Sequence, residues 1–227
     1  MRSLAVRARE EEQMDDAALD PGVYDSVLAG LGRVNRCTFA ARPTLSFLAR
    51  GTRGARRFTL LDVGFGEGGM LRTIAGWARR RGLDARLTGV DLNPKSAAVA
   101  ASMTPDDMAI DYVTGDYSDL GRFDFVVSSL VAHHMSDDQL LHFLRHMESH
   151  SDRGWLVNDL HRHPFAYAGF PLLARLLGVH RIVREDGRLS IARSFRPGEW
   201  TRILAEAGVP GDVRRYFPFR LCVERLR

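Results

Sequence analysis

The sequence predicts an α/β fold with a doubly wound, Rossmann-like sheet, mostly parallel, and helices on both of its faces. Strand and helix patterns alternate between about residues 57 and 160. The first strand pattern is a continuous apolar run that ends in glycines, which is typical of a buried parallel strand followed by a ligand-binding turn. The chain has 227 residues, of which 45% are hydrophobic, and this suits one such domain.

The alternating part is expected to contain five strands and three helices. Apolar runs predict strands at 58–63, 86–91, 111–114, 123–129 and 155–160, and amphipathic spacing predicts helices at 69–81, 94–101 and 136–149. Beyond them, the pattern predicts helices at 164–179 and 197–207, a polar connection over 181–192, and two closing strands at 213–218 and 220–225.

The residues before the first strand are expected to form two further parts. Residues 1–14 lack apolar periodicity and are predicted to be a disordered tail. Residues 15–52 are predicted to form a helical cap, and residues 53–227 form the main domain.

Composition excludes several classes of protein. No apolar stretch reaches the length of a membrane span and no signal peptide is evident, so a cytoplasmic protein is expected. The net charge is +4, but the arginines are scattered and Lys95 is the only lysine, so no nucleic-acid partner is expected. Neither the two cysteines nor the histidines are spaced as metal ligands, so the sequence predicts no metal site.

A glycine-rich turn follows the first strand. Gly64, Gly66 and Gly69 satisfy the dinucleotide-binding pattern G-x-G-x-x-G. However, carboxylates at Asp62 and Glu67 would repel a pyrophosphate and would suit a cationic ligand. The cofactor-binding residues expected here and at the following strand ends are Asp62, Gly64, Phe65, Gly66, Gly68, Asp91, Leu92, Asp116, Tyr117 and Ser129.

Residues 60–160 resemble class I S-adenosylmethionine (SAM)-dependent methyltransferases. The glycine loop, Asp91, Asp116 and the stretch 123–127 occur in the order that this family shows. The resemblance implies SAM as cofactor, S-adenosylhomocysteine (SAH) as product, and a seven-stranded sheet whose last strand, near 220–225, is antiparallel. It also implies a substrate-covering insertion at about 161–196.

The whole chain is similar to bacterial methyltransferases of ubiquinone and menaquinone biosynthesis and to relatives in natural-product pathways. The segments that carry this similarity are 20–21, 158–164 and 195–200. It implies a small phenolic, quinone-like or polyketide acceptor, with O-methylation in secondary metabolism as the main expectation and C-methylation in quinone biosynthesis as the alternative. The sequence is also compatible with a homodimer.

Histidines after two strands are the candidate catalytic bases. His133 and His134 follow the fourth strand, and His161 follows the fifth, where the carboxyl ends of parallel strands face the ligand crevice. A base there would remove a phenol proton during methyl transfer. Candidate acceptor-binding residues are Asp159 and Arg162 beside them, and Phe165 and Phe170 on the apolar helix that follows.

The main rival is a nicotinamide-dependent oxidoreductase, which the glycine pattern alone favours. The chain lacks the Tyr-x-x-x-Lys pair of short-chain dehydrogenases. Two other rivals are a relative that binds the cofactor without catalysis and an RNA methyltransferase. For the latter, residues 128–131 read Ser-Ser-Leu-Val where an Asn-Pro-Pro-Tyr-type motif would be expected.

Overall fold

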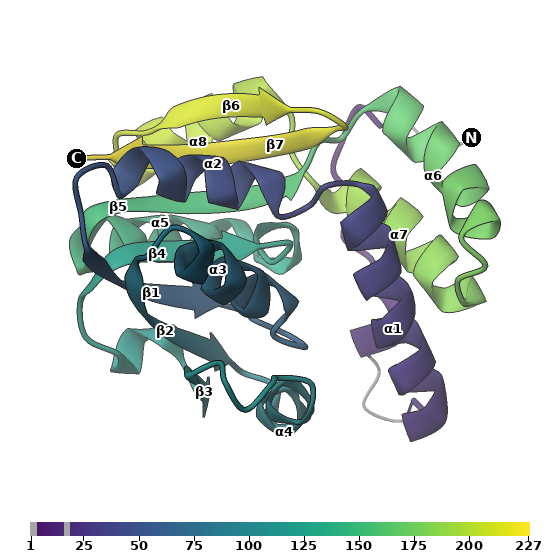
Figure 1. The fold of residues 1–227 in the computed structure, drawn as a ribbon. Coiled ribbons are helices and arrows are strands. Elements are labelled where there is room, and N and C mark those ends of the chain that lie inside the picture. The colour runs from purple at the N-terminus through teal and green to yellow at the C-terminus, as the bar shows by residue number, and fades with distance from the viewer. Residues whose placement is uncertain (1–3, 16–18) are drawn as a thin grey trace.

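The computed structural model describes residues 4–15 and 19–227 and contains one seven-stranded sheet (Figure 1). The strand order is β3-β2-β1-β4-β5-β7-β6. Strands β1 to β5 pair in parallel, and β7 is antiparallel to both β5 and β6. This confirms the predicted fold. The strands are β1 Arg57–Val63, β2 Asp84–Asp91, β3 Ile110–Thr114, β4 Phe123–Ser129, β5 Ser151–Leu160, β6 Asp212–Tyr216 and β7 Arg220–Leu226.

The chain reverses direction across the sheet between β1 and β4. From β1 it winds outward to β2 and β3, and it then returns to place β4 on the other side of β1. At such a switch point the connections leave in opposite directions, and a crevice opens at the carboxyl ends of the two strands. The fold therefore places a ligand site next to the turns after β1 and β4.

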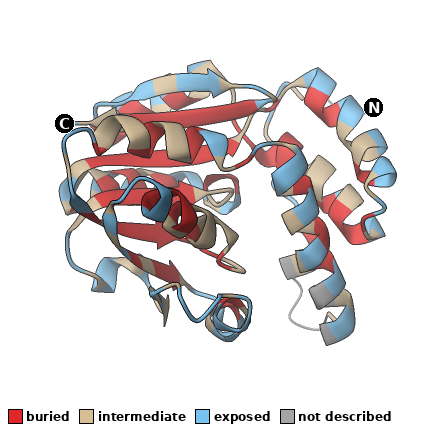
Figure 2. Ribbon diagram, viewed as in Figure 1, coloured by how far each residue is buried: buried red, intermediate tan, exposed pale blue. Residues whose placement is uncertain are grey.

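Helices cover both faces of the sheet. Helices α2 (Arg42–Gly51) and α3 (Gly69–Arg80) pack on one face, and α5 (Asp137–His150) and α8 (Pro197–Ala207) pack on the other (Figure 1). The strands between them are almost wholly buried (Figure 2). Helix α4 (Pro94–Ser102) follows β2, and its Ala100 joins the core beside α3.

Three helices gather beyond one end of the sheet (Figure 1). They are α1 (Pro21–Cys37), α6 (Pro164–Leu176) and α7 (Arg181–Arg193), and they share an apolar core. Helix α7 corrects the predicted polar connection over 181–192. The pattern was missed because Gly187 interrupts it and because Asp186 and Ser190 are polar yet buried.

Residues 4–15 also correct a prediction, because they lie against α7 rather than forming a free tail. Ala8 N–H donates to Ala192 O at 3.0 Å, and the Arg162 guanidinium donates to Leu4 O at 3.0 Å. The short helix η1 (Gln13–Asp15) follows. Polar long-range contacts hold this segment, so apolar periodicity could not reveal it. The first three residues of the predicted tail lie outside the described residues.

No helix in the described part of the chain is both long and apolar enough to span a membrane.

Candidate active site

A cleft of about 1820 Å³ opens at the switch point of the sheet. One end is lined by the turn after β1 and by the ends of β2 and β3, and the other end is lined by α1 and by the turn after β4. That turn contains the short helix η3 (Ala132–His134). The predicted glycine loop, the helical cap and the candidate base His134 therefore meet at one cleft.

The glycine loop takes a conformation that side chains would obstruct. Gly64, Gly66 and Gly68 have φ values of +75°, +56° and +77°. A Cβ on Gly64 would lie 2.4 Å from the Val131 side chain, so the turns after β1 and β4 approach each other closely. Gly66 N–H donates to Asp91 Oδ2 at 2.9 Å, which ties the loop to the end of β2. The glycines are thus required for both the turn and the approach.

Asp62 is the most perturbed carboxyl group in the cleft. It is 1% exposed, and neither of its oxygens has a hydrogen-bond partner within the described residues. Burial, and next the charge of Asp91, raise the pKa of the Asp62 carboxyl to about 8. The Ser129 hydroxyl, also at the cleft, is buried without a partner too. Such orphaned groups fit a polar ligand that brings its own donors.

Most of the predicted cofactor-binding residues line the cleft. They are Asp62, Gly64, Phe65, Gly66, Asp91, Leu92, Tyr117 and Ser129. The other two predicted residues, Gly68 and Asp116, are not among the residues that line the cleft. Gly68 is the N-cap of α3, and the Asp116 carboxylate accepts from Ser118 N–H at 2.8 Å and caps the short helix η2 (Tyr117–Asp119).

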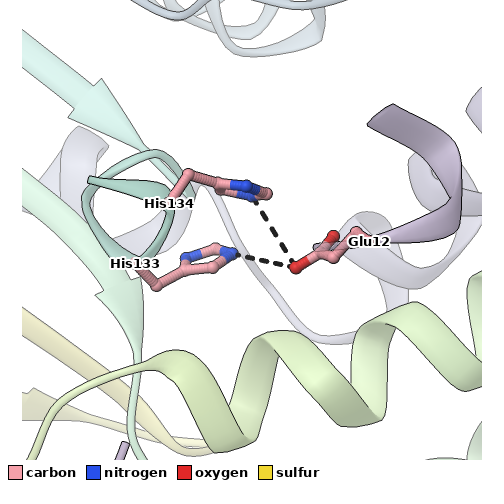
Figure 3. Close-up of side chains that lie close together, drawn as sticks. All are labelled: Glu12, His133 and His134. Atoms are coloured by element: carbon pink, nitrogen blue, oxygen red, sulfur yellow. Dashed lines mark ion pairs between the residues drawn. The ribbon is translucent and has the colours of Figure 1, made fainter. Parts of the chain in front are cut away.

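The two candidate histidines of η3 face a carboxylate of the N-terminal segment (Figure 3). Glu12 Oε1 lies 3.7 Å from His133 Nε2 and 3.8 Å from His134 Nε2. His133 and Glu12 are buried, whereas the side chain of His134 is 32% exposed and lines the cleft. Of the three predicted bases, His134 is therefore the one that reaches the cleft.

His133 is enclosed between two carboxylates. Its Nδ1 lies 2.7 Å from Asp159 Oδ1, and its backbone N–H donates to Asp159 Oδ2 at 2.9 Å. Burial disfavours the charged ring, but the carboxylates of Asp159 and then Glu12 outweigh it and raise the pKa of His133 to about 9. Asp159, which the sequence predicts as an acceptor contact, is fully buried, and its oxygens are engaged by His133 and by Leu160 N–H.

The other predicted acceptor contacts also lie away from the cleft. Arg162 is 1% exposed and donates to Leu4 O, Ser194 O and Glu199, so its guanidinium serves the fold. Phe165 is exposed on α6. Phe170 packs into the apolar core between α6 and α7, against Gly187. These three residues follow β5, as the sequence predicts, but none of them lines the cleft.

His161 lines a separate, smaller cavity of about 510 Å³ together with His163 and Phe219. Burial, followed by the charge of His163, lowers the pKa of His161 to about 4. His161 is thus separated from the other two candidates although all three follow strand ends.

Sequence reasoning missed two residues of the site, Glu12 and Arg220. Glu12 was assigned to the tail, and no local pattern marks it. Arg220 begins β7, is 3% exposed and lines the cleft, and its Nη1 has no partner among the described residues. An arginine directly before three apolar strand residues was the available signal, because a buried charge calls for a partner.

Fold and cleft together are those of a Rossmann-like protein with a candidate ligand site at the switch point of its sheet. Residues 60–154 match the family described as "Methyltransferase domain". No curated protein sequence matches the chain significantly.

Several solved methyltransferase structures are similar in fold. One is magnesium protoporphyrin IX methyltransferase from Synechocystis PCC 6803 with bound SAM (TM-score 0.55, 14% identity, covering 95% of this chain and 88% of that chain). Two others are plantazolicin methyltransferases in complex with SAH and a desmethylPZN analog. BamL has a TM-score of 0.66 at 14% identity (86% and 73% covered), and BpumL has 0.66 at 13% (92% and 91% covered).

These findings confirm the predicted fold. The chain has the fold of class I methyltransferases, and its residues 60–154 match the methyltransferase-domain family. The cofactor predicted from the sequence and its product are the molecules named in these structures.

Proposed function

We propose that this chain transfers the methyl group of SAM to an oxygen atom of a small phenolic, quinone-like or polyketide acceptor in natural-product biosynthesis. The observation that carries the proposal is the single cleft, which joins an acidic, glycine-lined end to an apolar end with one buried guanidinium. The plantazolicin methyltransferases among the similar structures, solved with desmethylPZN analogs, support an organic acceptor of the natural-product kind.

The acidic end fits SAM better than a dinucleotide. Asp91 Oδ1 and Oδ2 each accept one backbone N–H at 2.9 Å, and a carboxylate oxygen has a further lone pair for a ribose hydroxyl. The orphaned Asp62 would hold the ammonium group of the methionine moiety, whereas it would repel a pyrophosphate. When bound, SAM supplies an electrophilic methyl group on a sulfonium.

The apolar end fits a flat organic acceptor. Leu28 and Leu31 of α1, Phe39 after it, and Val131 and Met135 after β4 line this part of the cleft. Such walls bury the body of a small molecule, while a few polar groups fix its orientation.

Arg220 supports an acceptor that carries oxygen. Its Nη2 lies 3.4 Å from Asn35 Oδ1, which is a weak contact, and its Nη1 is buried without a partner in the described structure. A phenol, quinone or carboxylate oxygen would satisfy this donor with a charge-assisted hydrogen bond. Arg220 and His134 are therefore the proposed acceptor contacts, in place of the residues that the sequence suggested.

The three candidate histidines separate into different roles. His134 lines the cleft, and we place it next to the atom that receives the methyl group. His133 is enclosed by carboxylates and positions its neighbour, while His161 lies at the second cavity and takes no part in the reaction. The enzyme's main contribution is to hold cofactor and acceptor in line for displacement.

The proposal is tested by incubating the chain and labelled SAM with a panel of phenols, hydroxyquinones and alkylpyrones. We expect label in an O-methyl ether and weaker turnover for Arg220→Met with unchanged SAH binding. Label on a ring carbon would instead establish the C-methyltransferase alternative. SAH binding without transfer to any member of the panel would contradict the proposed acceptor class.

A further inference from the structure

Three side chains from two distant parts of the sequence converge beside the cleft. Glu12 comes from the N-terminal segment, and His133 and His134 come from η3 after β4 (Figure 3). One carboxylate oxygen and two imidazole Nε2 atoms all lie within 4.8 Å of one another. Two of these separations, from Glu12 Oε1 to each ring, are 3.7 and 3.8 Å.

These separations suit an ion better than direct hydrogen bonds. An N–H···O bond places its heavy atoms about 2.7–3.2 Å apart, which is shorter than either contact. Two metal–ligand bonds of about 2.0–2.2 Å that meet at a tetrahedral angle place the donor atoms roughly 3.4 Å apart. Shifts of a few tenths of an ångström bring Glu12 Oε1 to that spacing from each ring, and a rotation of the two rings, whose donor atoms lie within 4.8 Å of each other, brings them together. The three donors therefore face a common centre that a cation can occupy.

Hydrogen bonds orient two of the three donors, His133 and Glu12, in the way that metal ligands are usually oriented. His133 directs Nδ1 to Asp159 Oδ1 at 2.7 Å, which leaves Nε2 to face the centre of the cluster. Ser190 Oγ donates to Glu12 Oε1 at 2.7 Å, which fixes that carboxylate. Metal-bound histidines typically have such a carboxylate on the second ring nitrogen, and metal-bound carboxylates are themselves hydrogen-bonded.

The local charge also favours a cation. The buried carboxylates of Glu12 and Asp159 both lie against the His133 ring, and Glu12 also faces His134. The guanidinium of Arg7 donates to Asp137 and, at 3.5 Å, to His133 O. The guanidinium of Arg193, the nearest basic side chain on α7, is turned to carbonyl oxygens. It donates to Glu10 O at 2.9 Å and to His133 O at 3.3 Å.

We propose that Glu12, His133 and His134 form a binding site for a divalent transition-metal ion of the Zn²⁺ type. Two imidazoles and one carboxylate are a ligand set that Zn²⁺ takes in sites with one open position. His134 lines the cleft, so the open position lies on the acceptor side and can take an acceptor oxygen. The ion also fastens residues 4–15 to the end of β4. The site stands on its own geometry, independently of the acceptor proposed above.

The test is a titration of the metal-free chain, prepared with a chelator, with Zn²⁺ alone in a calorimeter. We expect one ion per chain, and we expect Glu12→Gln and His134→Gln each to weaken binding by at least tenfold. The matched control is the double variant His161→Gln/His163→Gln, which removes a neighbouring histidine pair outside the cluster and should retain wild-type affinity. SAH binding, measured on every variant, shows that the fold is intact.

A second measurement needs no variant. Co²⁺ added to the wild-type chain should give the intense visible absorption of a four-coordinate N/O site, and equimolar Zn²⁺ should abolish it. Zn²⁺ binding that is lost in the control pair but kept in Glu12→Gln would overturn the proposal. So would a wild-type chain that gives neither a Zn²⁺ heat nor this Co²⁺ spectrum, and the cluster would then be a buried ion-pair network.

Discussion

The two ends of the cleft are built in different ways. The cofactor end is the acidic, glycine-lined end proposed to hold SAM, and the acceptor end is the apolar end proposed to hold the acceptor. The cofactor end comes from consecutive strand ends and one contiguous loop, so its residues lie close together in sequence as well as in space. The acceptor end joins α1, the turn after β4 and the first residue of β7, and the N-terminal segment lies directly behind it. The cofactor end is thus a local structure supported by the sheet, whereas the acceptor end exists only when distant segments pack together.

The two ends therefore depend on different kinds of residue. The cofactor end follows from a turn that only glycine can make, because Gly64 has φ +75° and faces Val131. The acceptor end depends on buried polar contacts, such as those of Glu12 and Arg220, that no short motif encodes. We therefore expect changes at the acceptor end to alter turnover and folding, and changes at the cofactor end to alter binding.

The largest expected effect is on turnover at the acceptor end. His134→Gln should lower methyl transfer by about 10²-fold or more, because it removes the histidine that lines the cleft. His161→Gln, in the second cavity, should stay within about threefold of wild type. Both are measured with labelled SAM and an acceptor that the wild type methylates. Equal rates for the two variants would remove the distinction between the two cavities.

The next effect is on stability. Deleting residues 1–13 removes Glu12 and Arg7 and leaves the buried His133 with one carboxylate partner instead of two. Breaking a buried ion pair costs about 3–5 kcal/mol, so the free energy of unfolding in urea should fall by about that much. The control is Arg9→Ala, whose ion pair with Asp137 is exposed and should contribute less than about 1 kcal/mol. A truncated chain as stable as wild type would restore the disordered-tail prediction.

The fold and the cofactor end could be predicted from sequence because their signals are local. Apolar runs gave the strands, and the glycine loop with Asp62 and Asp91 gave the crevice. The rest depends on tertiary packing. Helix α7 was missed because its buried face carries polar residues, and Glu12 was missed because its partners lie more than a hundred residues away. Arg162 looked like an acceptor contact because its burial against the N-terminal segment cannot be inferred from its neighbours in sequence.

A smaller effect is expected on the pH dependence of SAH binding at the cofactor end. The pKa of Asp62 is raised to about 8, so below that pH the carboxyl is protonated and must lose its proton to bind an ammonium group. SAH affinity should therefore rise with pH, by up to tenfold per unit between about pH 6 and 8, and level off above. Calorimetry in two buffers with different ionisation heats should show proton release at pH 7, and Asp62→Asn should abolish it. An affinity that is flat over this range would mean that Asp62 does not contact the ligand.

The most direct test of the central claim is calorimetric titration of the wild-type chain and Asp91→Ala with SAH and with NAD. A methyltransferase cleft predicts that the wild type binds SAH and gives no heat with NAD. Asp91→Ala should weaken SAH binding by about 1–3 kcal/mol, because a charge-assisted pair of hydrogen bonds is lost. NAD binding without any SAH heat would contradict the claim and identify the glycine loop as a dinucleotide site.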